Sequence, residues 1–148
     1  MSETAKHFLT PSEQQEIISA VKEAELDTSG EIRVHLENRC RKEVLDRAAY
    51  LFKHLQMHKT KLRNGVLFYL SVHDHKFAIL GDIGINQVVP ENFWDEIKDG
   101  MQKQFRDGDF VEGLSEGIIK AGKQLKDHFP YQQDDVNELA DDISFGKT

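Results

Sequence analysis

The 148-residue sequence is poor in cysteine and proline, with one cysteine and three prolines, and it has no long apolar run. The single cysteine, Cys40, excludes a disulfide within the chain and is typical of a reducing compartment. No stretch approaches the roughly 18 apolar residues of a membrane span. Residues 1–7 contain no apolar core of signal-peptide length. We therefore expect a cytoplasmic protein that makes no use of a membrane.

The sequence also lacks an excess of positive charge. Lys and Arg number 19 against 26 Asp and Glu, so the formal net charge is −7. This balance argues against nucleic-acid binding and is compatible with binding a cation. A chain of this length can bury a core without staples. We expect a monomer with one domain at residues 8–129 and an acidic, flexible tail at 130–148, in which Ile143 and Phe145 can dock locally.

The apolar pattern centres on a hairpin. Residues 66–72 form a nearly unbroken apolar run, which is typical of a strand buried on both faces. A short polar turn follows, and residues 77–80 return as an antiparallel partner. Residues 31–37 alternate polar and apolar, which indicates an edge or near-edge strand with one buried face. A helix connects this strand to the hairpin, so the two strands should be parallel.

Four helices are expected around this mixed sheet, which places the chain in the α/β class. Thr10, Pro11 and Glu13 form a capping box with proline at the first helical position. The second helix covers residues 42–58, and the third runs from Pro90 to Arg106. Gly108 then supplies a left-handed cap. Residues from 109 onward form the fourth helix.

Acidic and amide side chains should meet at one edge of this sheet. Glu31 opens the first strand and Asn64 precedes the second, so they share an edge if these strands are parallel. The third strand runs in the opposite direction and returns Asp82 to that edge. Asp107 and Asp109, in a nearby loop between helices, are possible additions. Calcium or magnesium prefers such an all-oxygen set, so these residues are candidate metal ligands.

A purely structural interpretation competes with this metal site. In it, Glu31 is solvated, Asn64 shapes the turn before the strand, and Asp109 is only a helix cap. The two glycines beside Asp82 suit unusual backbone conformations. The sequence contains neither a Gly-x-Ser-x-Gly nucleophile motif nor a glycine-rich phosphate loop with its lysine. It does not itself identify a catalytic residue.

Several motifs, taken together in order and spacing, resemble the TPM domain family, whose members include a thylakoid-lumen phosphatase. They cover residues 8–129 and are Thr28-Ser29-Gly30-Glu31-Ile32, Asn64-Gly65-Val66, Asp74-His75-Lys76, Gly84-Ile85, Val89-Pro90, Arg106-Asp107-Gly108-Asp109-Phe110 and Gly113-Leu114. The resemblance implies a three-layer α/β/α sandwich, divalent cation binding in some members and acid phosphatase activity in a few.

The sequence departs from the family pattern in its acidic positions. Many members have glycine at the position of Asp82 and an acid at that of Asn86. Many also carry a signal peptide and a membrane anchor, which are not found here. With its ending Ile143-Ser144-Phe145-Gly146, the chain resembles a soluble bacterial branch of the family.

Two functions from different classes remain. The first is a domain that binds calcium or magnesium at the acidic sheet edge, with weak acid phosphatase activity. Asp82 would be its main ligand, and the cation would neutralise phosphate oxygens. The second is a non-catalytic module that binds a protein partner through the acidic tail or an edge strand.

Overall fold

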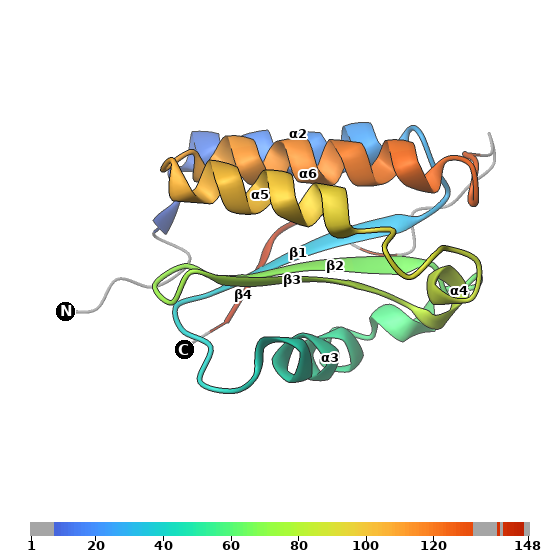
Figure 1. The fold of residues 1–148 in the computed structure, drawn as a ribbon, viewed down its shortest axis with the longest axis horizontal. Helices are drawn as coiled ribbons and strands as arrows, with labels where there is room; N and C mark the ends of the chain where they lie inside the picture. Colours follow the sequence, from blue (N-terminus) through green and yellow to red (C-terminus); the bar gives the residue numbers. More distant parts are fainter. Residues whose placement is uncertain (1–7, 132–138, 140, 147–148) are drawn as a thin grey trace.

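The computed structural model describes residues 8–131, 139 and 141–146, whose strands form one four-stranded mixed sheet (Figure 1). The strand order is β3-β2-β1-β4. The elements are β1 (Glu31–Glu37), β2 (Gly65–Ser71), β3 (Lys76–Gly81), β4 (Ser144–Phe145), α2 (Pro11–Glu25), α3 (Val44–His54), α5 (Asp95–Arg106) and α6 (Phe110–Leu125). Helices α2, α5 and α6 cover one face and α3 covers the other (Figure 1). The predicted α/β/α sandwich is confirmed.

The strand directions are those expected from the connections. Strand β1 pairs parallel with β2, and Ile32 lies opposite Val66. Strand β2 pairs antiparallel with β3, and Phe68 lies opposite Ile79. Every residue of β2 is buried. The apolar run in the sequence therefore marks the strand that both helical layers cover.

Strand β1 differs from the prediction of one buried face. It does lie near the sheet edge, but six of its seven residues are buried and Arg33 is intermediate. Its apolar residues pack under α2 and α6, whereas Glu31, His35 and Glu37 are buried as well. Alternation in the sequence identified the apolar face correctly, but the polar face is covered by the protein and not by water.

Helix α2 begins with the capping box that the sequence predicts. The Thr10 hydroxyl accepts from the Glu13 N–H at 3.1 Å, and the Glu13 carboxylate accepts from the Thr10 N–H at 2.9 Å. Gly108 follows α5 with a φ of +86°, which confirms the left-handed cap. Within the described residues, none of the helices is both long and apolar enough to cross a membrane.

Two helices are shorter than expected. Helix α3 ends at His54, and the chain continues through a left-handed Gln56 into the short 3₁₀ helix η1 (Met57–Lys59). Helix α5 begins at Asp95, after turns at residues 91–94, and not at Pro90. None of the four expected helices lies between Asp82 and Pro90, but Asp82 is followed directly by the one-turn helix α4 (Ile83–Asn86).

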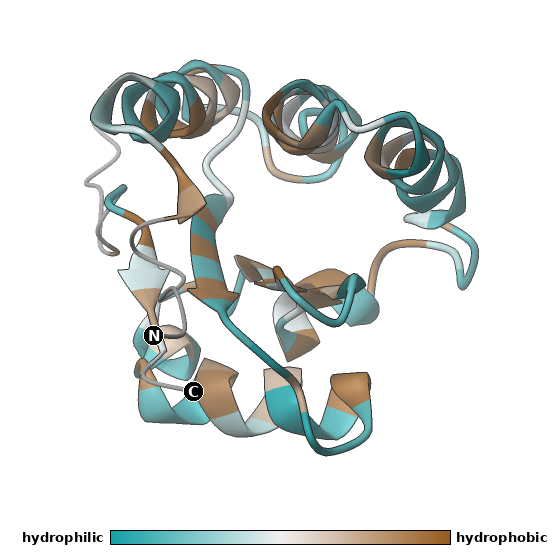
Figure 2. Cartoon of the chain, turned by 90° about the vertical axis from the view of Figure 1, so that its left-hand side faces the viewer, coloured by the Kyte–Doolittle hydropathy of each residue, from teal (hydrophilic) through white to brown (hydrophobic). Residues whose placement is uncertain are grey.

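The core has two parts, one on each face of the sheet. The larger part lies between the sheet and α2, α5 and α6, and the smaller one lies between the sheet and α3. In the end-on view of Figure 2, the apolar sides of the three helices turn toward the sheet. Residues alternate along β2, so Phe68 belongs to the larger part and Tyr69 to the smaller.

Part of the segment expected to be a flexible tail belongs to the sheet. Ser144 and Phe145 pair with His35 and Leu36 of β1 in parallel. The Gly146 N–H continues the ladder by donating to the Leu36 carbonyl at 2.8 Å. Ile143 is buried, so this segment docks locally, as its two apolar residues suggested. Of the acidic residues in the expected tail, Asp134, Asp135 and Glu138 lie outside the described residues, whereas Asp141 and Asp142 lie within them.

The close approach of α2 and α6 at Gly122 generates a stability prediction. A Cβ at Gly122 would lie 2.7 Å from the Ala24 carbonyl oxygen, whereas one at Gly100 in α5 would have no neighbour nearer than the Lys120 Nζ at 3.9 Å. We expect Gly122→Ala to lower the free energy of unfolding by about 1–3 kcal/mol through overpacking. Gly100→Ala should raise it by about 0.5–1 kcal/mol, since alanine favours a helix interior. Urea denaturation measures both, and equal effects would contradict this packing.

Candidate functional site

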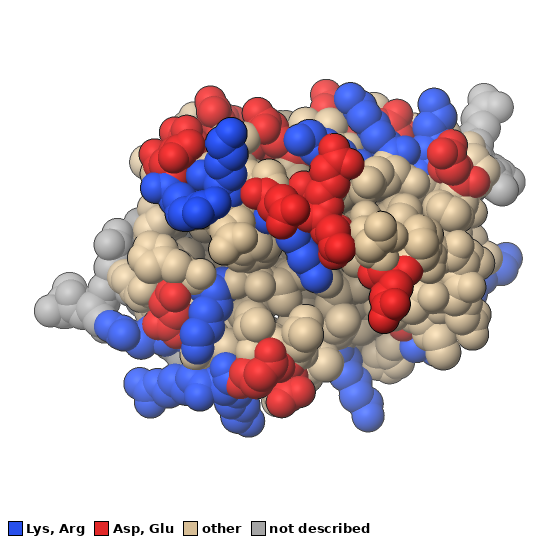
Figure 3. Space-filling view, in the orientation of Figure 1, with Lys and Arg blue, Asp and Glu red and all other residues tan. Residues whose placement is uncertain are grey.

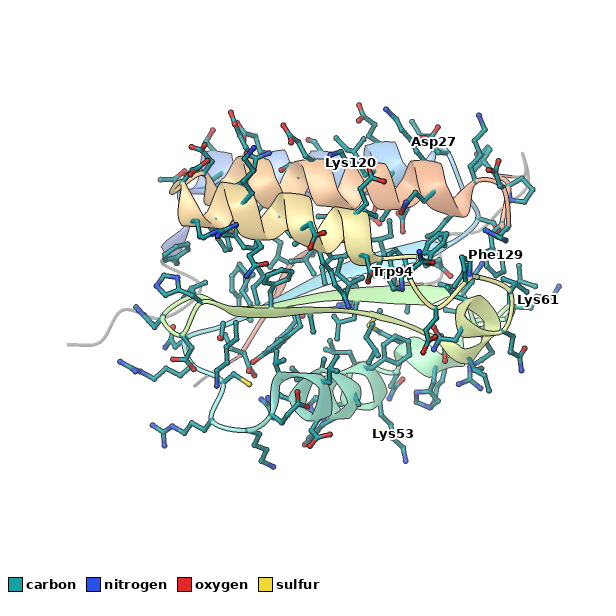
Figure 4. The ribbon with its side chains drawn as sticks, viewed as in Figure 1. Asp27, Lys53, Lys61, Trp94, Lys120 and Phe129 are labelled. Atoms are coloured by element: carbon teal, nitrogen blue, oxygen red, sulfur yellow. The ribbon has the colours of Figure 1, made fainter. Side chains whose placement is uncertain are left out.

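Three of the predicted site residues lie along the same rim of the sheet. Glu31 is opposite Gly65, the residue after Asn64, and its N–H donates to the Asn64 carbonyl at 3.2 Å. On the other side of β2, the Asp82 N–H donates to the Gly65 carbonyl at 2.9 Å. This is the end of the molecule that Lys61 and Phe129 mark in Figure 4.

Asp82 holds a cationic side chain at this rim. Its Oδ2 accepts from Arg63 Nε at 2.8 Å and its Oδ1 accepts from Arg63 Nη2 at 2.9 Å. Oδ1 also accepts from the Ile83 N–H at 2.7 Å and so caps α4. The Asp82 side chain is 6% exposed and that of Arg63 is 46% exposed. The carboxylate is therefore sealed in the protein, whereas the guanidinium that neutralises it reaches into solvent.

Gly84 explains why α4 can lie so close to Arg63. A Cβ at Gly84 would be 2.3 Å from the Leu62 carbonyl oxygen and 2.5 Å from that of Arg63. The Gly84 N–H donates to the Arg63 carbonyl at 2.9 Å. Of the two glycines beside Asp82, neither has a positive φ. Gly84 is needed for close approach and not for an unusual backbone conformation, whereas a Cβ at Gly81 would be 3.3 Å from its nearest neighbour, the Ile85 side chain.

Glu31 and Asp82 share the rim but have separate partners. Gly65 lies between them in the sheet, and adjacent strands are about 4.8 Å apart, so their Cα atoms are separated by roughly two strand spacings. Leu139 covers Gly65 and donates its N–H to Glu31 Oε1 at 2.7 Å. The Asn64 amide donates to the Ser29 carbonyl at 3.3 Å. The rim is therefore acidic, but its carboxylates do not converge on one point.

Asp107 and Asp109 lie at the opposite rim, so the expectation that their loop is near Asp82 is wrong. The far end of α6 reaches Gly30, where Leu125 Cδ1 would be 3.3 Å from a Cβ. Its first residue, Phe110, lies instead beside the hairpin turn. The direction of a 16-residue helix decides this, and the sequence does not show it. Asp109 is the N-cap residue of α6, but its side chain makes no capping hydrogen bond.

The described part of the chain contains no group of three or more His, Cys, Asp or Glu side chains placed to hold a metal ion together. Asp82 has the hard oxygen donors that calcium or magnesium requires. A cation could use them only by displacing the Arg63 guanidinium. The described residues at this rim therefore do not form a preformed cage for a cation.

The sequence analysis missed a buried polar network around Glu37, at the other end of β1. The Glu37 side chain is 0% exposed. Its Oε2 accepts from the Tyr69 hydroxyl at 2.5 Å, and its two oxygens accept from Arg47 Nε at 3.2 and 3.1 Å. His35 Nε2 lies 3.3 Å from Oε1. A fully buried carboxylate is thus surrounded by donors from β2, α3 and its own strand.

The C-terminal segment completes this network. Ser144 Oγ lies 2.7 Å from His35 Nδ1 and donates to the Val34 carbonyl at 3.2 Å. A Cβ at Gly146 would lie 2.5 Å from Glu37 Cγ, so only glycine fits there without a shift. The spacing of His35 and Glu37, two apart on one strand, placed them on the same face. Their partners at positions 47, 69 and 144 gave no sequence signal.

Charge on Glu37 is strongly favoured. Burial alone would raise its pKa, but hydrogen bonds from His35, Arg47 and Tyr69 outweigh burial and lower the pKa to about 2. Burial and the neighbouring carboxylate raise the pKa of Tyr69 far above its usual value, so its hydroxyl remains a donor. Because this network is closed to solvent at Glu37, we assign it a role in stability.

Glu25 lies beside β1, and its pKa is shifted in the direction opposite to that of Glu37. Its Oε2 accepts from the Ile32 N–H at 3.0 Å. Burial, a side-chain hydrogen bond with Asp141 and the negative charge of Glu31 raise the pKa of Glu25 to about 9, against the lowering effect of the Ile32 N–H. Glu25 is therefore protonated at neutral pH. Its proton allows its side chain to lie beside that of Asp141, to which it is hydrogen-bonded.

We expect Glu37 to make stability depend on pH in acid. Its pKa is lower in the folded than in the unfolded state, so its contribution is complete above the unfolded value of 4.5 and is lost as pH falls toward 2. The wild type should exceed Glu37→Gln in free energy of unfolding at pH 6, and the gap should shrink by on the order of 3 kcal/mol by pH 2. The exposed Glu91→Gln is the control in denaturant titrations. A gap that stays constant with pH would refute the assignment.

Glu25 should produce the reverse dependence in neutral and alkaline solution. The folded state keeps a proton that the unfolded state loses above pH 4.5, so stability should fall as pH rises toward 9. Relative to Glu25→Gln, which mimics the protonated acid, the wild type should lose at most on the order of 1 kcal/mol per pH unit. Thermal unfolding from pH 5 to 9 measures this, with the exposed Glu23→Gln as control. Parallel curves for wild type and Glu25→Gln would be the contrary result.

The geometry can be compared with that of known proteins. The family model of the TPM domain matches residues 3–124. The NMR structure of BA42 from the psychrophilic bacterium Bizionia argentinensis is 49% identical, with a TM-score of 0.91, over 99% of this chain and 100% of that chain. The N-terminal domain of a P. gingivalis protein is 19% identical, with a TM-score of 0.69, over 84% of this chain and 82% of that one, which shows a shared fold. None of the curated proteins matches. On the match of the family model, this chain belongs to the TPM domain family.

Proposed function

We propose that this TPM domain binds a divalent cation, calcium or magnesium, at Asp82 in exchange for the Arg63 guanidinium. The observation that carries the proposal is the unequal exposure of this ion pair. The carboxylate is fixed by the Ile83 N–H and is nearly buried, whereas its cationic partner is about half exposed on a flexible side chain. The Asp82 carboxylate already binds one positive group. A metal cation would therefore need to displace only the mobile Arg63 side chain.

The ligands available at this rim indicate weak binding. Asp82 contributes the charged oxygens, and Asn64 lies next to Gly65, whose carbonyl accepts from the Asp82 N–H. Glu31 contributes negative potential from the other side of Gly65. Calcium tolerates irregular sets of carboxylate, carbonyl and water oxygens, so it should bind more readily than magnesium, which demands a regular octahedron.

Weak hydrolysis of phosphate monoesters belongs to the same proposal. A cation at Asp82 would neutralise phosphate oxygens and polarise a bound water. Arg63, once released from Asp82, can pair with a phosphate through its planar fork of N–H donors. These residues bind and orient a phosphate group. The proposal assigns no protein nucleophile.

We predict that calcium shifts the amide signals of residues 63–65 and 82–84 in a saturable manner. Asp82→Asn should abolish these shifts because it removes the charged ligand. Arg63→Gln should strengthen binding by roughly tenfold, since it removes the competing cation. Two matched controls, Arg106→Gln and Asp109→Asn at the opposite rim, should leave the affinity unchanged. The readout is a heteronuclear NMR titration with calcium and then with magnesium.

The outcomes separate the parts of this proposal. Unchanged binding in Asp82→Asn, or weaker binding in Arg63→Gln, would overturn the exchange site. Hydrolysis of an aryl phosphate that persists in Asp82→Asn would exclude this rim as its location. The alternative function, a protein-interaction module, stays a prediction. Its candidate edge is β3, which pairs only with β2 among the described strands.

A further inference from the structure

A pocket of about 170 Å³ lies at the end of the molecule opposite Asp82. It is enclosed by the hairpin turn between β2 and β3, by the loop between α5 and α6, and by the residues just before α2, which meet at the left of Figure 1. Its lining residues are Phe8, Leu70, Ser71, Val72, His75, Lys76, Phe77, Phe105, Gly108 and Phe110.

Four phenylalanines form a continuous wall around this pocket. The rings of Phe8 and Phe110 meet edge to face at 5.2 Å, those of Phe110 and Phe105 stack at 5.2 Å, and those of Phe105 and Phe77 meet edge to face at 5.3 Å. Each ring thus already has a preferred aromatic partner on one side. A planar guest in the pocket can meet ring edges and faces without rearranging them.

The polar side chains of the lining do not supply a charge to the interior. Lys76 lies opposite Ser71 in the hairpin, and its Nζ donates to the Cys40 carbonyl at 3.2 Å, on the α3 side of the sheet. Since paired residues of a hairpin point to the same face, Ser71 also turns away from the pocket. His75 is exposed at the turn. Most of the lining residues are aromatic or aliphatic.

The loop between α5 and α6 leaves space beside the pocket at Gly108. Gly108 adopts a φ of +86° and carries no side chain, and nothing lies within 4 Å of the position that its Cβ would take. His75 at the hairpin turn also has a positive φ, of 57°. In Figure 3, uncharged surface lies at this end between the charged side chains over the helices and those below the sheet.

We infer that this pocket binds a small, uncharged aromatic molecule with a single ring. Its volume is comparable to the roughly 150 Å³ of an engineered apolar cavity that stays dry and takes up benzene. A guest that covers this apolar lining removes it from water and gains contacts with the surrounding rings, so it binds favourably. A charged guest would lose its hydration without gaining a partner. This inference is independent of the cation site, which occupies the other rim.

The test uses the full chain and benzene as the probe, with benzoate as the charged analogue. We expect saturable shifts for benzene at the amides of Val72, Phe77 and Gly108, and nuclear Overhauser contacts from benzene to the methyl groups of Leu70 and Val72. Benzoate should bind at least roughly tenfold more weakly, because its carboxylate has no partner there. Amide shifts that rise linearly with benzene concentration, without saturation, would overturn the inference. It would also be overturned if benzene contacts the methyl groups of neither Leu70 nor Val72.

Variants supply the second arm. Val72→Phe fills the pocket and should abolish benzene binding, whereas Val88→Phe, the same change at an exposed position on the opposite rim, should leave it intact. Benzene should also raise the melting temperature of the wild type and of Val88→Phe, but not that of folded Val72→Phe. If Val72→Phe does not fold, the location is decided by the nuclear Overhauser contacts between benzene and the methyl groups of Leu70 and Val72 in the wild type. Equal binding by both folded variants would refute this location.

Discussion

The structure depends on strand β2, which is covered by helices on both faces of the sheet and hydrogen-bonded to a neighbouring strand on each side. Every residue of β2 is buried, and it joins a parallel neighbour to an antiparallel one. That arrangement sets which residues meet at each rim: Glu31, Asn64 and Asp82 at one end, and the hairpin turn at the other. The helices then divide the apolar surface into a large core under α2, α5 and α6 and a smaller one under α3. The cation site and the aromatic pocket that we propose lie at opposite ends of this strand.

The elements that the sequence predicts well are those determined by local chemistry. The run at residues 66–72, the capping box at Thr10 and the glycine after α5 depend on the residues themselves and their immediate neighbours. The rim could also be predicted, since strand direction follows from the connections. The family motifs extended this to the sandwich as a whole.

The partners of the buried charges could not be predicted, because they come from distant parts of the chain. Asp82 pairs with Arg63, which follows a tight turn, and Glu37 pairs with Arg47 from the next helix and Tyr69 from the next strand. Alternation along β1 suggested water on the polar face, since period alone does not distinguish solvent from a covering layer. The position of Asp109 depended on how α6 runs across the sheet, which its apolar pattern does not specify.

The pairing of β4 with β1 closes a loop of more than a hundred residues, yet the strand contributes only two residues to the ladder. Few backbone hydrogen bonds therefore hold β4 in place against the gain in chain entropy on its release. The rest of the sheet can persist without β4. Such a partial opening would admit water to Glu37 and His35 while β1, β2 and β3 remain paired. Glu37, which has hydrogen bonds with three side chains, is thus covered by one of the shortest elements among the described residues.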